Sequence, residues 1–351
     1  MEDMILFIKK YPEMILDAIR ATQRADLPSY KAGRDYNKIL VCGMGGSAIG
    51  GDLLKNLLRD FLGPSSALPI ESIEVSRQYR LPSNVDKKTL IFCVSYSGNT
   101  EETLSQFVEA RKSGHKIIAI TSDGRLKDWC AQLGVPLIEL PRGFVPRAAM
   151  PYLFIPLVEY VAGDFLRKDL EESIRVLETI RKDMKEMENI EKAADLMKDH
   201  WIAIYGPDDL EAVARRAKTQ INENSKLPAT WAVFPELCHN EIVGYEDNDL
   251  NMDLYVVILR DDINEDEPMK VRIETIREII QSRVKGVVEL YAVGKSKLSR
   301  MLSLLFYVDL LSCHLAVAGE KAPEKTENID KLKTVLREKI NLQEKLEREL
   351  I

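Results

Sequence analysis

The chain has 351 residues, 45% of them hydrophobic and 30% charged, which suits one large or two medium soluble domains rather than a disordered chain. Its formal net charge of −7 argues against nucleic acid or an anionic membrane surface as the main partner. The longest stretch without a charged residue, Ile39–Gly51, is far shorter than the roughly 20 apolar residues of a membrane-spanning helix.

The first half of the sequence alternates strand and helix patterns. Short apolar runs at residues 38–42, 90–94, 116–121 and 136–140 predict strands, and the segments between them have helical periodicity. This spacing suits βαβ crossovers and predicts a parallel sheet with helices on both faces. Residues 146–162 are almost entirely apolar and predict a largely buried helix.

The second half repeats this alternation after a highly charged, helix-favouring segment at residues 167–200, which we interpret as a helical connector. The elements expected after it are strands at 201–205, 250–259 and 287–293, helices at 210–222 and 268–281, an apolar helix at 301–318, and a terminal amphipathic helix at 327–351.

These patterns predict an α/β protein with two tandem doubly wound parallel-sheet domains and a C-terminal helix. We expect a first domain at residues 1–163, a helical connector at 164–200, a second domain at 201–320, and a helical segment at 321–351 that contributes to the active site. The five cysteines are scattered without CxxC spacing, and the N-terminus has no pattern of a signal peptide. We therefore expect a cytoplasmic protein with reduced thiols.

Two loops carry the chemistry of the first half. Gly43-Met44-Gly45-Gly46-Ser47 follows a predicted strand and opens a helix, where free backbone N–H groups attract anions. Ser95-Tyr96-Ser97-Gly98-Asn99-Thr100 follows another strand in the same way. Loops at the carboxyl ends of parallel strands meet at one edge of the sheet. Together, Ser47, Ser95, Ser97 and Thr100 predict a phosphate-binding site.

Each loop has other interpretations when it is taken alone. Either could be a plain turn, and Gly43, Gly45 and Ala48 match the G-x-G-x-x-A pattern of a nicotinamide-dependent oxidoreductase. However, the second strand, near residues 73–75, is followed by Ser76 and Arg77 rather than by an acid for the ribose. The sequence also lacks the G-K-[ST] of a nucleotide-hydrolysing loop.

The sequence resembles a known family in several motifs and in their order. VCGMGGSAIGGD and VSYSGNTEET resemble the two loops of the sugar isomerase (SIS) fold. With GFVPRAAMPY, ENSKLPA, PELCHNEIVGYE and TENIDKLK, the stretch from about residue 20 to about residue 335 resembles the bifunctional phosphoglucose/phosphomannose isomerases. This resemblance implies two SIS domains, a homodimer, and aldose–ketose isomerisation of hexose 6-phosphates through a cis-enediolate.

The resemblance also implies residue roles. Glu223 would transfer the proton and Arg147 would stabilise the enediolate. His239 of the neighbouring subunit would open the sugar ring with Lys333, and Thr326 would leave room near C2. Each has a plainer alternative: on pattern alone Glu223 lies off the apolar stripe of its helix, and the others could be surface, N-cap or structural residues. The implied substrate-binding residues are Gly45, Gly46, Ser47, Ser95, Ser97, Thr100 and Thr326.

We therefore expect an isomerase that interconverts glucose 6-phosphate and mannose 6-phosphate with fructose 6-phosphate, without a cofactor, a metal, a nucleic-acid partner or a membrane. The alternative is a non-catalytic SIS-type protein that senses sugar phosphates, because SIS domains also serve regulators. The second half has no serine-rich loop of its own, so we expect one phosphate site per chain.

Overall fold

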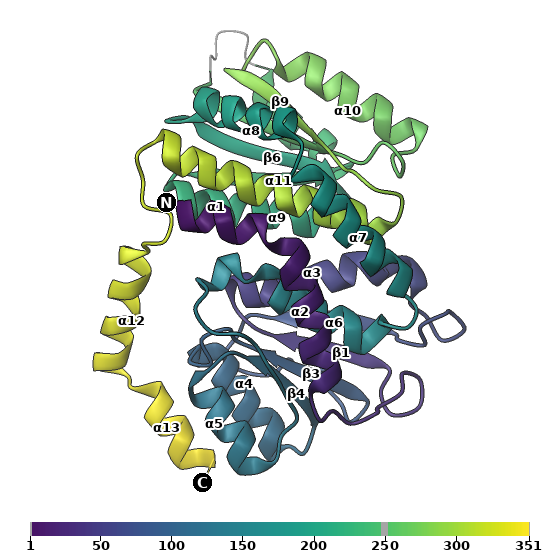
Figure 1. Cartoon of the computed structure of the whole chain (residues 1–351), viewed down its shortest axis with the longest axis vertical. Coiled ribbons are helices and arrows are strands. Elements are labelled where there is room, and N and C mark those ends of the chain that lie inside the picture. The colour runs from purple at the N-terminus through teal and green to yellow at the C-terminus, as the bar shows by residue number, and fades with distance from the viewer. Residues whose placement is uncertain (1, 247–251, 351) are drawn as a thin grey trace. The chain divides into compact units, whose positions relative to one another are not determined.

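A computed structural model describes residues 2–246 and 252–350 (Figure 1). By its internal contacts the chain divides into two compact units. The first-sheet unit consists of Glu13–Arg167 and Thr326–Ile351, and the second-sheet unit consists of Met1–Pro12 and Lys168–Lys325. Each contains one parallel β-sheet with helices against it, as the sequence predicts.

The sheet of the first unit has the strand order β2-β1-β3-β4-β5, and every neighbouring pair is parallel. This is a doubly wound order, in which ligands bind between the two central strands, β1 and β3, because the connections that follow them run to opposite sides of the sheet. β3 is buried along its whole length, which explains its uninterrupted apolar sequence. The strands are β1 (Lys38–Cys42), β2 (Ser72–Ser76), β3 (Thr89–Val94), β4 (Lys116–Thr121) and β5 (Leu137–Glu139).

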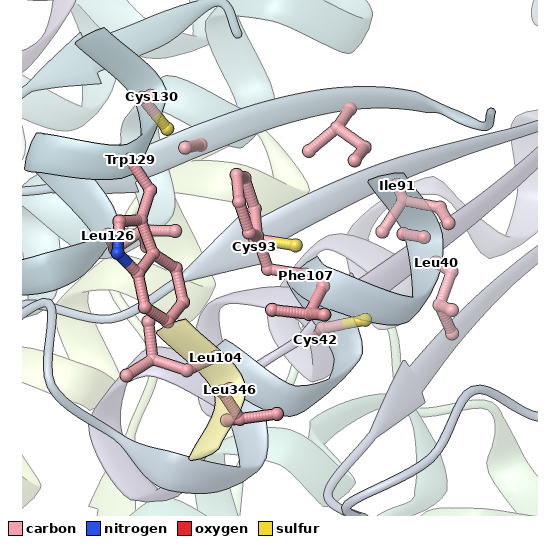
Figure 2. Close-up of a cluster of buried hydrophobic side chains, with 14 residues drawn as sticks. Leu40, Cys42, Ile91, Cys93, Leu104, Phe107, Leu126, Trp129, Cys130 and Leu346 are labelled. Carbon is pink, nitrogen blue, oxygen red and sulfur yellow. The ribbon is translucent and has the colours of Figure 1, made fainter. Parts of the chain in front are cut away.

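The helices of the first unit are α2 (Tyr11–Arg24), α3 (Gly45–Leu58), α4 (Glu101–Lys112), α5 (Gly124–Leu133), α6 (Met150–Ala162), α12 (Glu327–Lys339) and α13 (Leu342–Leu350), with short 3₁₀ helices at Arg59–Phe61 and Pro146–Ala148. Figure 2 shows part of the core, where Phe107 and Trp129 stack and the thiols of Cys42 and Cys93 are fully buried. The two thiols are therefore small core residues.

The second unit has a sheet with the order β7-β6-β8-β9, again all parallel, which is equivalent to the order β2-β1-β3-β4 of the first. Its strands are β6 (Trp201–Pro207), β7 (Ala229–Phe234), β8 (Leu254–Arg260) and β9 (Gly286–Tyr291). Its helices are α1 (Glu2–Lys9), α7 (Arg167–Ile180), α8 (Met184–Met197), α9 (Glu211–Gln220), α10 (Glu267–Ile280) and α11 (Lys297–Ala318), with 3₁₀ helices at Asp208–Leu210, Glu236–His239 and Glu241–Tyr245 and a π-helix at Ile221–Ser225.

Helix α11 is the central helix of the second unit. It is long and apolar enough to cross a membrane, yet most of its residues are buried inside the unit, as in the core helix of a soluble protein. α8, α9 and α1 all pack against it. It also carries a fully buried carboxylate, Asp309, whose ionic partner lies on α9.

The structure departs from the predicted elements at several places. The segment 167–200 is helical as expected, but it forms two helices, and α8 packs on α11 within the second unit. The helix predicted at 146–162 begins as a 3₁₀ turn. The helix predicted at 210–222 continues into a π-helix, and the single terminal helix predicted at 327–351 is interrupted after Lys339. Strand β7 was missed, and Leu250 and Asn251 of the predicted strand 250–259 lie outside the described residues.

Candidate active site

The two predicted loops follow β1 and β3, which are neighbours in the first sheet. They therefore meet at the point where the chain reverses its winding direction, the usual ligand position in this topology. α3 begins at Gly45 and α4 begins at Glu101. Within the described residues, no side chain caps the first turn of either helix, so the backbone N–H groups there are suited to binding an anion.

Hydroxyl groups form hydrogen bonds within the second loop and between the two loops. The Ser95 and Thr100 hydroxyl oxygens lie 2.9 Å apart in a hydrogen bond. The Ser47 hydroxyl accepts a hydrogen bond from the Tyr96 backbone N–H at 3.3 Å, which links the first loop to the second. Ser95 and Ser47 are buried, whereas Ser97 is exposed. We call Ser47, Ser95, Ser97, Thr100 and the start of α3 the hydroxyl cradle.

Arg147 lies beside this cradle. It is 5% exposed and sits in the 3₁₀ helix Pro146–Ala148, not in the α-helix that the sequence predicts. A Cβ atom placed on Gly46 would lie 3.6 Å from the Arg147 Cα and 3.5 Å from the Pro146 carbonyl oxygen. These are ordinary van der Waals distances, so the first loop lies next to the segment that carries Arg147, and an alanine at position 46 would also fit.

Tyr96 connects the second loop with the segment that carries Arg147, and sequence reasoning missed this role. Its hydroxyl donates to the Pro141 carbonyl oxygen at 2.7 Å and accepts from the Phe144 N–H at 3.0 Å. Burial raises the pKa of Tyr96, so the phenol stays protonated and can make both bonds. The available signal was its position between two loop serines that end a buried strand.

The residues that follow β4 hold the second loop by a hydrogen bond and by close packing. The Ser122 hydroxyl donates to the Tyr96 carbonyl oxygen at 2.7 Å. Gly98 has φ +66, and a Cβ atom on it would lie only 1.7 Å from the Asp123 carbonyl oxygen. Only glycine is compatible with both the left-handed backbone and this approach. Contacts with Ser122 and Asp123 therefore fix the backbone conformation of the second loop of the cradle.

Glu223 lies in the other unit, within the π-helix Ile221–Ser225. The prediction that Glu223 lies off the apolar stripe assumed 100° per residue, and this assumption fails in a π-helix. The residues that follow it are anchored to α11: the Asn224 amide donates to the Ser312 hydroxyl at 2.9 Å, and the Ser225 hydroxyl donates to the Ser312 carbonyl at 2.8 Å. Glu223 itself is half-buried. π-helices of one turn occur often at functional sites.

Lys226 closes the turn after Glu223, and sequence reasoning missed it as well. It has φ +61, and its ammonium group donates hydrogen bonds to the carbonyl oxygens of Glu223 and Lys325. Lys325 is the residue before Thr326 in the chain. This one side chain therefore ties the Glu223 turn to the segment that leads into α12.

A buried ionic network holds α9, the helix that leads into the Glu223 turn. The Arg216 guanidinium donates to the two carboxylate oxygens of Asp309 at 2.9 and 2.7 Å, and the Tyr11 hydroxyl donates to the same carboxylate at 2.5 Å. Burial alone would lower the pKa of Arg216, but the Asp309 carboxylate outweighs it and the pKa is raised. Burial, reinforced by Asp309, also raises the pKa of Tyr11. Arg216 stays charged and Tyr11 stays protonated.

His239, Lys333 and Thr326 are at the surface of their own units. His239 is exposed at the end of the 3₁₀ helix Glu236–His239. Lys333 is exposed on α12, a helix that is described in full and buries none of its residues. Thr326 occupies the N-cap position of α12, but its side chain makes no capping hydrogen bond within the described chain. The structure thus brings the cradle and Arg147 together in one unit and has Glu223 and His239 in the other.

The equivalent edge of the second sheet has the opposite character. A pocket of about 170 Å³ lies after β6 and β8 and is lined largely by acidic side chains, namely Asp208, Asp209, Asp261, Glu265 and Asp266. Burial raises the pKa of Asp261, although Arg300 acts to lower it. Three of these carboxylates are paired with basic side chains, Lys297, Arg300 and Arg260, so the edge has a moderate excess of negative charge, which disfavours an anion. That the chain has one phosphate site stays a prediction.

Comparisons with known proteins identify the family. A model of the SIS domain matches residues 34–125, and a model of the bacterial phospho-glucose isomerase C-terminal SIS domain matches residues 186–336. A bifunctional phosphoglucose/phosphomannose isomerase of Caldicellulosiruptor bescii is 40% identical over 314 residues, covering 87% of this chain and 91% of that protein. The chain belongs to the bifunctional phosphoglucose/phosphomannose isomerase family.

This membership confirms the resemblance seen in the sequence and the fold class of two SIS domains. A relative of Sulfolobus acidocaldarius with a different name, a D-glucosamine-6-phosphate 4-epimerase, is 33% identical and covers 82% of this chain and 87% of its own length. The fold also matches that of the C-terminal domain of glucosamine-fructose-6-phosphate aminotransferase from Francisella tularensis, with a TM-score of 0.70 at 17% identity over 92% of this chain and 98% of that one.

Proposed function

We propose that this isomerase interconverts glucose 6-phosphate and mannose 6-phosphate with fructose 6-phosphate. The observation that carries the proposal is the hydroxyl cradle beside a buried arginine at the switch point of the first sheet, in a chain of this family. The reaction moves a carbonyl group between C1 and C2 of one sugar, so it needs proton transfers but no external oxidant or reductant. It therefore requires no redox cofactor.

The phosphate of the substrate is held by the cradle. Ser47, Ser95, Ser97 and Thr100 supply hydroxyl groups, and Gly45 and Gly46 supply N–H groups at the start of α3. Hydrogen bonds to a charged group contribute about 1.5–3 kcal/mol each, so several of them hold a dianion without a lysine. Rearrangement of the Ser95–Thr100 hydrogen bond frees a hydroxyl proton for the ligand.

Arg147 and Glu223 carry out the isomerisation step. The Glu223 carboxylate takes the proton from C2 of the aldose and returns it to C1, while the electron pair moves through a cis-enediolate. The hydroxyl proton passes from O2 to O1, so that the carbonyl group moves from C1 to C2. The positive charge of Arg147, which is nearly shielded from water, stabilises the negative charge on the enediolate oxygen. The anchoring of Asn224 and Ser225 to α11 supports this role, because it fixes the backbone on which the base is carried.

His239 and Lys333 open the sugar ring, with His239 supplied by the second subunit of a homodimer. The exposure of both side chains supports this, since neither is used by the interior of its own unit. Thr326, at the start of α12, leaves room near C2, where glucose and mannose differ. The enzyme acts in the cytoplasm on a small-molecule hexose 6-phosphate.

The test is NMR spectroscopy of the purified enzyme with fructose 6-phosphate in heavy water. We expect deuterium at C1 of fructose 6-phosphate and at C2 of the glucose and mannose 6-phosphates that form. Glu223→Gln should lower the rate about 10²–10⁴-fold while leaving phosphate binding intact. A sugar-phosphate sensor would incorporate no deuterium, and an epimerase would give a product changed at C4. Normal turnover by Glu223→Gln would exclude it as the base.

Mixing two inactive variants tests the shared site. Glu223→Gln and His239→Ala are each expected to be inactive, and unfolding and refolding them together forms mixed dimers. If His239 acts across the interface, one of the two sites in a mixed dimer has both native side chains and activity returns. If both residues of a site come from one subunit, no mixed dimer has an intact site and the mixture stays inactive.

A further inference from the structure

The chain ends in a helix that none of the proposed functional roles explains. α13 spans Leu342–Leu350 and lies beyond residue 336, where the match to the family model stops. It follows α12 after a break at Ile340 and Asn341, and Asn341 has φ +48, a left-handed conformation that asparagine tolerates well. The break redirects the chain, so that α13 packs along α4 while α12 does not enter the core.

α13 is docked by a buried apolar contact. Leu346 is 5% exposed and joins the core cluster of the first unit, where it lies close to Leu104 of α4 (Figure 2). Leu342 and Leu350 pack against the same cluster from one turn on either side. An ion pair between Lys112 and Glu349 at 2.8 Å adds a contact at the far end of the helix.

The other end of α13 contacts the second loop of the hydroxyl cradle directly. The Gln343 side-chain amide donates a hydrogen bond to the Asn99 backbone carbonyl at 2.8 Å. Its amide oxygen accepts from the Arg125 guanidinium at 3.4 Å, and Arg125 also pairs with Glu347 one turn further along α13. These bonds join residues more than 200 positions apart in the chain.

Asn99 lies between the cradle residues Ser97 and Thr100 and sets their positions. Its backbone N–H donates to the Ser97 hydroxyl at 3.4 Å, and its side-chain amide donates to the Ser97 carbonyl at 3.0 Å. Its side-chain oxygen accepts from the Arg125 N–H at the start of α5, at 3.2 Å. The Asn99 carbonyl is thus the point at which α13 holds the loop.

We infer that Gln343 is a positioning residue for the phosphate site: by holding the Asn99 carbonyl, it fixes Ser97 and Thr100 in the arrangement that receives the substrate phosphate. The inference rests on the proposed function for the identity of the ligand, but it concerns phosphate affinity and not the isomerisation step.

The test compares two substitutions on the same helix. Gln343→Met keeps the side-chain length but cannot donate to Asn99, and the control Glu349→Gln breaks the ion pair with Lys112 and leaves the loop contact in place. Titration with inorganic phosphate, followed by calorimetry, should give about fivefold weaker binding for Gln343→Met, corresponding to one lost hydrogen bond, and no change for Glu349→Gln. KM for fructose 6-phosphate should rise by the same factor, with kcat nearly unchanged.

A purely structural role for Gln343 would lower the melting temperature without changing phosphate affinity or KM, and this result would overturn the inference. Equal phosphate affinities for Gln343→Met and wild type would also overturn it. If the wild-type chain binds phosphate but does not isomerise fructose 6-phosphate, the proposed function fails while the inference stands. If the wild-type chain binds no phosphate, both the cradle and the role of Gln343 are wrong.

Discussion

The buried pair of Arg216 and Asp309 allows a quantitative prediction about stability. Both side chains are almost completely removed from solvent, with exposures of 1% and 0%. Asp309→Ala would leave the guanidinium charge in the core without this carboxylate, and breaking a buried pair in this way costs about 3–5 kcal/mol. Because folded domains are stable by only about 5–15 kcal/mol, the variant should lose a large share of its free energy of unfolding.

The double variant Arg216→Met/Asp309→Leu separates the charge from the packing. It removes both ions and fills the space with apolar atoms, but it leaves the buried Tyr11 hydroxyl without these partners. We therefore make it in a Tyr11→Phe background and expect it to recover most of the lost free energy there. Tyr11→Phe removes one hydrogen bond to Asp309 and should cost only about 0.5–1.5 kcal/mol, since Arg216 still satisfies the carboxylate. A large loss of free energy for Asp309→Ala, with much smaller losses for the other two variants, would show that the unpaired buried charge causes the destabilisation.

Urea unfolding followed by circular dichroism measures the three free energies. Extrapolation to zero denaturant at a common slope gives each difference from wild type. A loss of less than about 1 kcal/mol for Asp309→Ala would refute the reasoning, because it would mean that water reaches the pair. A double variant less stable than Asp309→Ala would also refute it, because packing and not charge would then dominate.

Two other predictions concern the cradle and acid stability. Gly98→Ala should lower the free energy of unfolding clearly more than the control Gly134→Ala. Gly134 has a similar φ of +63 but nothing within 4 Å of a new Cβ atom, so its substitution should cost about 1–2 kcal/mol. Equal losses in urea unfolding would contradict the close approach of Gly98 to Asp123. Burial lowers the pKa of His314 below its ordinary value of 6.5, and Lys9 acts in the same direction, whereas Glu191 and Asp195 oppose the shift. The contribution of the neutral imidazole to stability is therefore complete above about pH 6.5 and is lost as the pH falls through the folded-state pKa. The melting temperature should therefore decrease less between about pH 7.5 and about pH 5.5 for His314→Gln than for the wild type. Equal decreases would contradict the role of His314.

The elements that the sequence predicted well are those whose burial is uniform. β1, β3 and β4 read as continuous apolar runs because helices cover both faces of the sheet, and glycine or serine marks where each of the first two ends. The edge strand β7 was missed although the edge strand β9, which is also partly exposed, was predicted. The difference lies in the sequence, because β9 has consecutive valines at 287 and 288 whereas β7 has no run of β-branched residues. Local patterns thus located the cradle but not the full second sheet.

The features that sequence reasoning missed depend on distant contacts. The extra residue per turn in the π-helix at Glu223 is held by Ser312 of α11, and no periodicity within 221–225 encodes it. The contact of Gln343 with Asn99 joins the end of the chain to a loop in its first third. Asn341 was a usable signal for the break between α12 and α13, because asparagine is common where a helix ends in a left-handed residue.

The different charge of the two sheet edges affects where an anionic ligand binds. Two parallel sheets of the same topology each present the carboxyl ends of their strands, where ligands usually bind. Five carboxylates gather after β6 and β8, and although Lys297, Arg300 and Arg260 pair with three of them, the remaining excess of negative charge makes this edge less favourable for a dianion than the hydroxyl cradle. This electrostatic preference weakens as salt screens it, and neutralising the acids alone would not create a second phosphate site, because residues 206–210 and 261–268 contain no serine or threonine hydroxyl groups to replace the cradle.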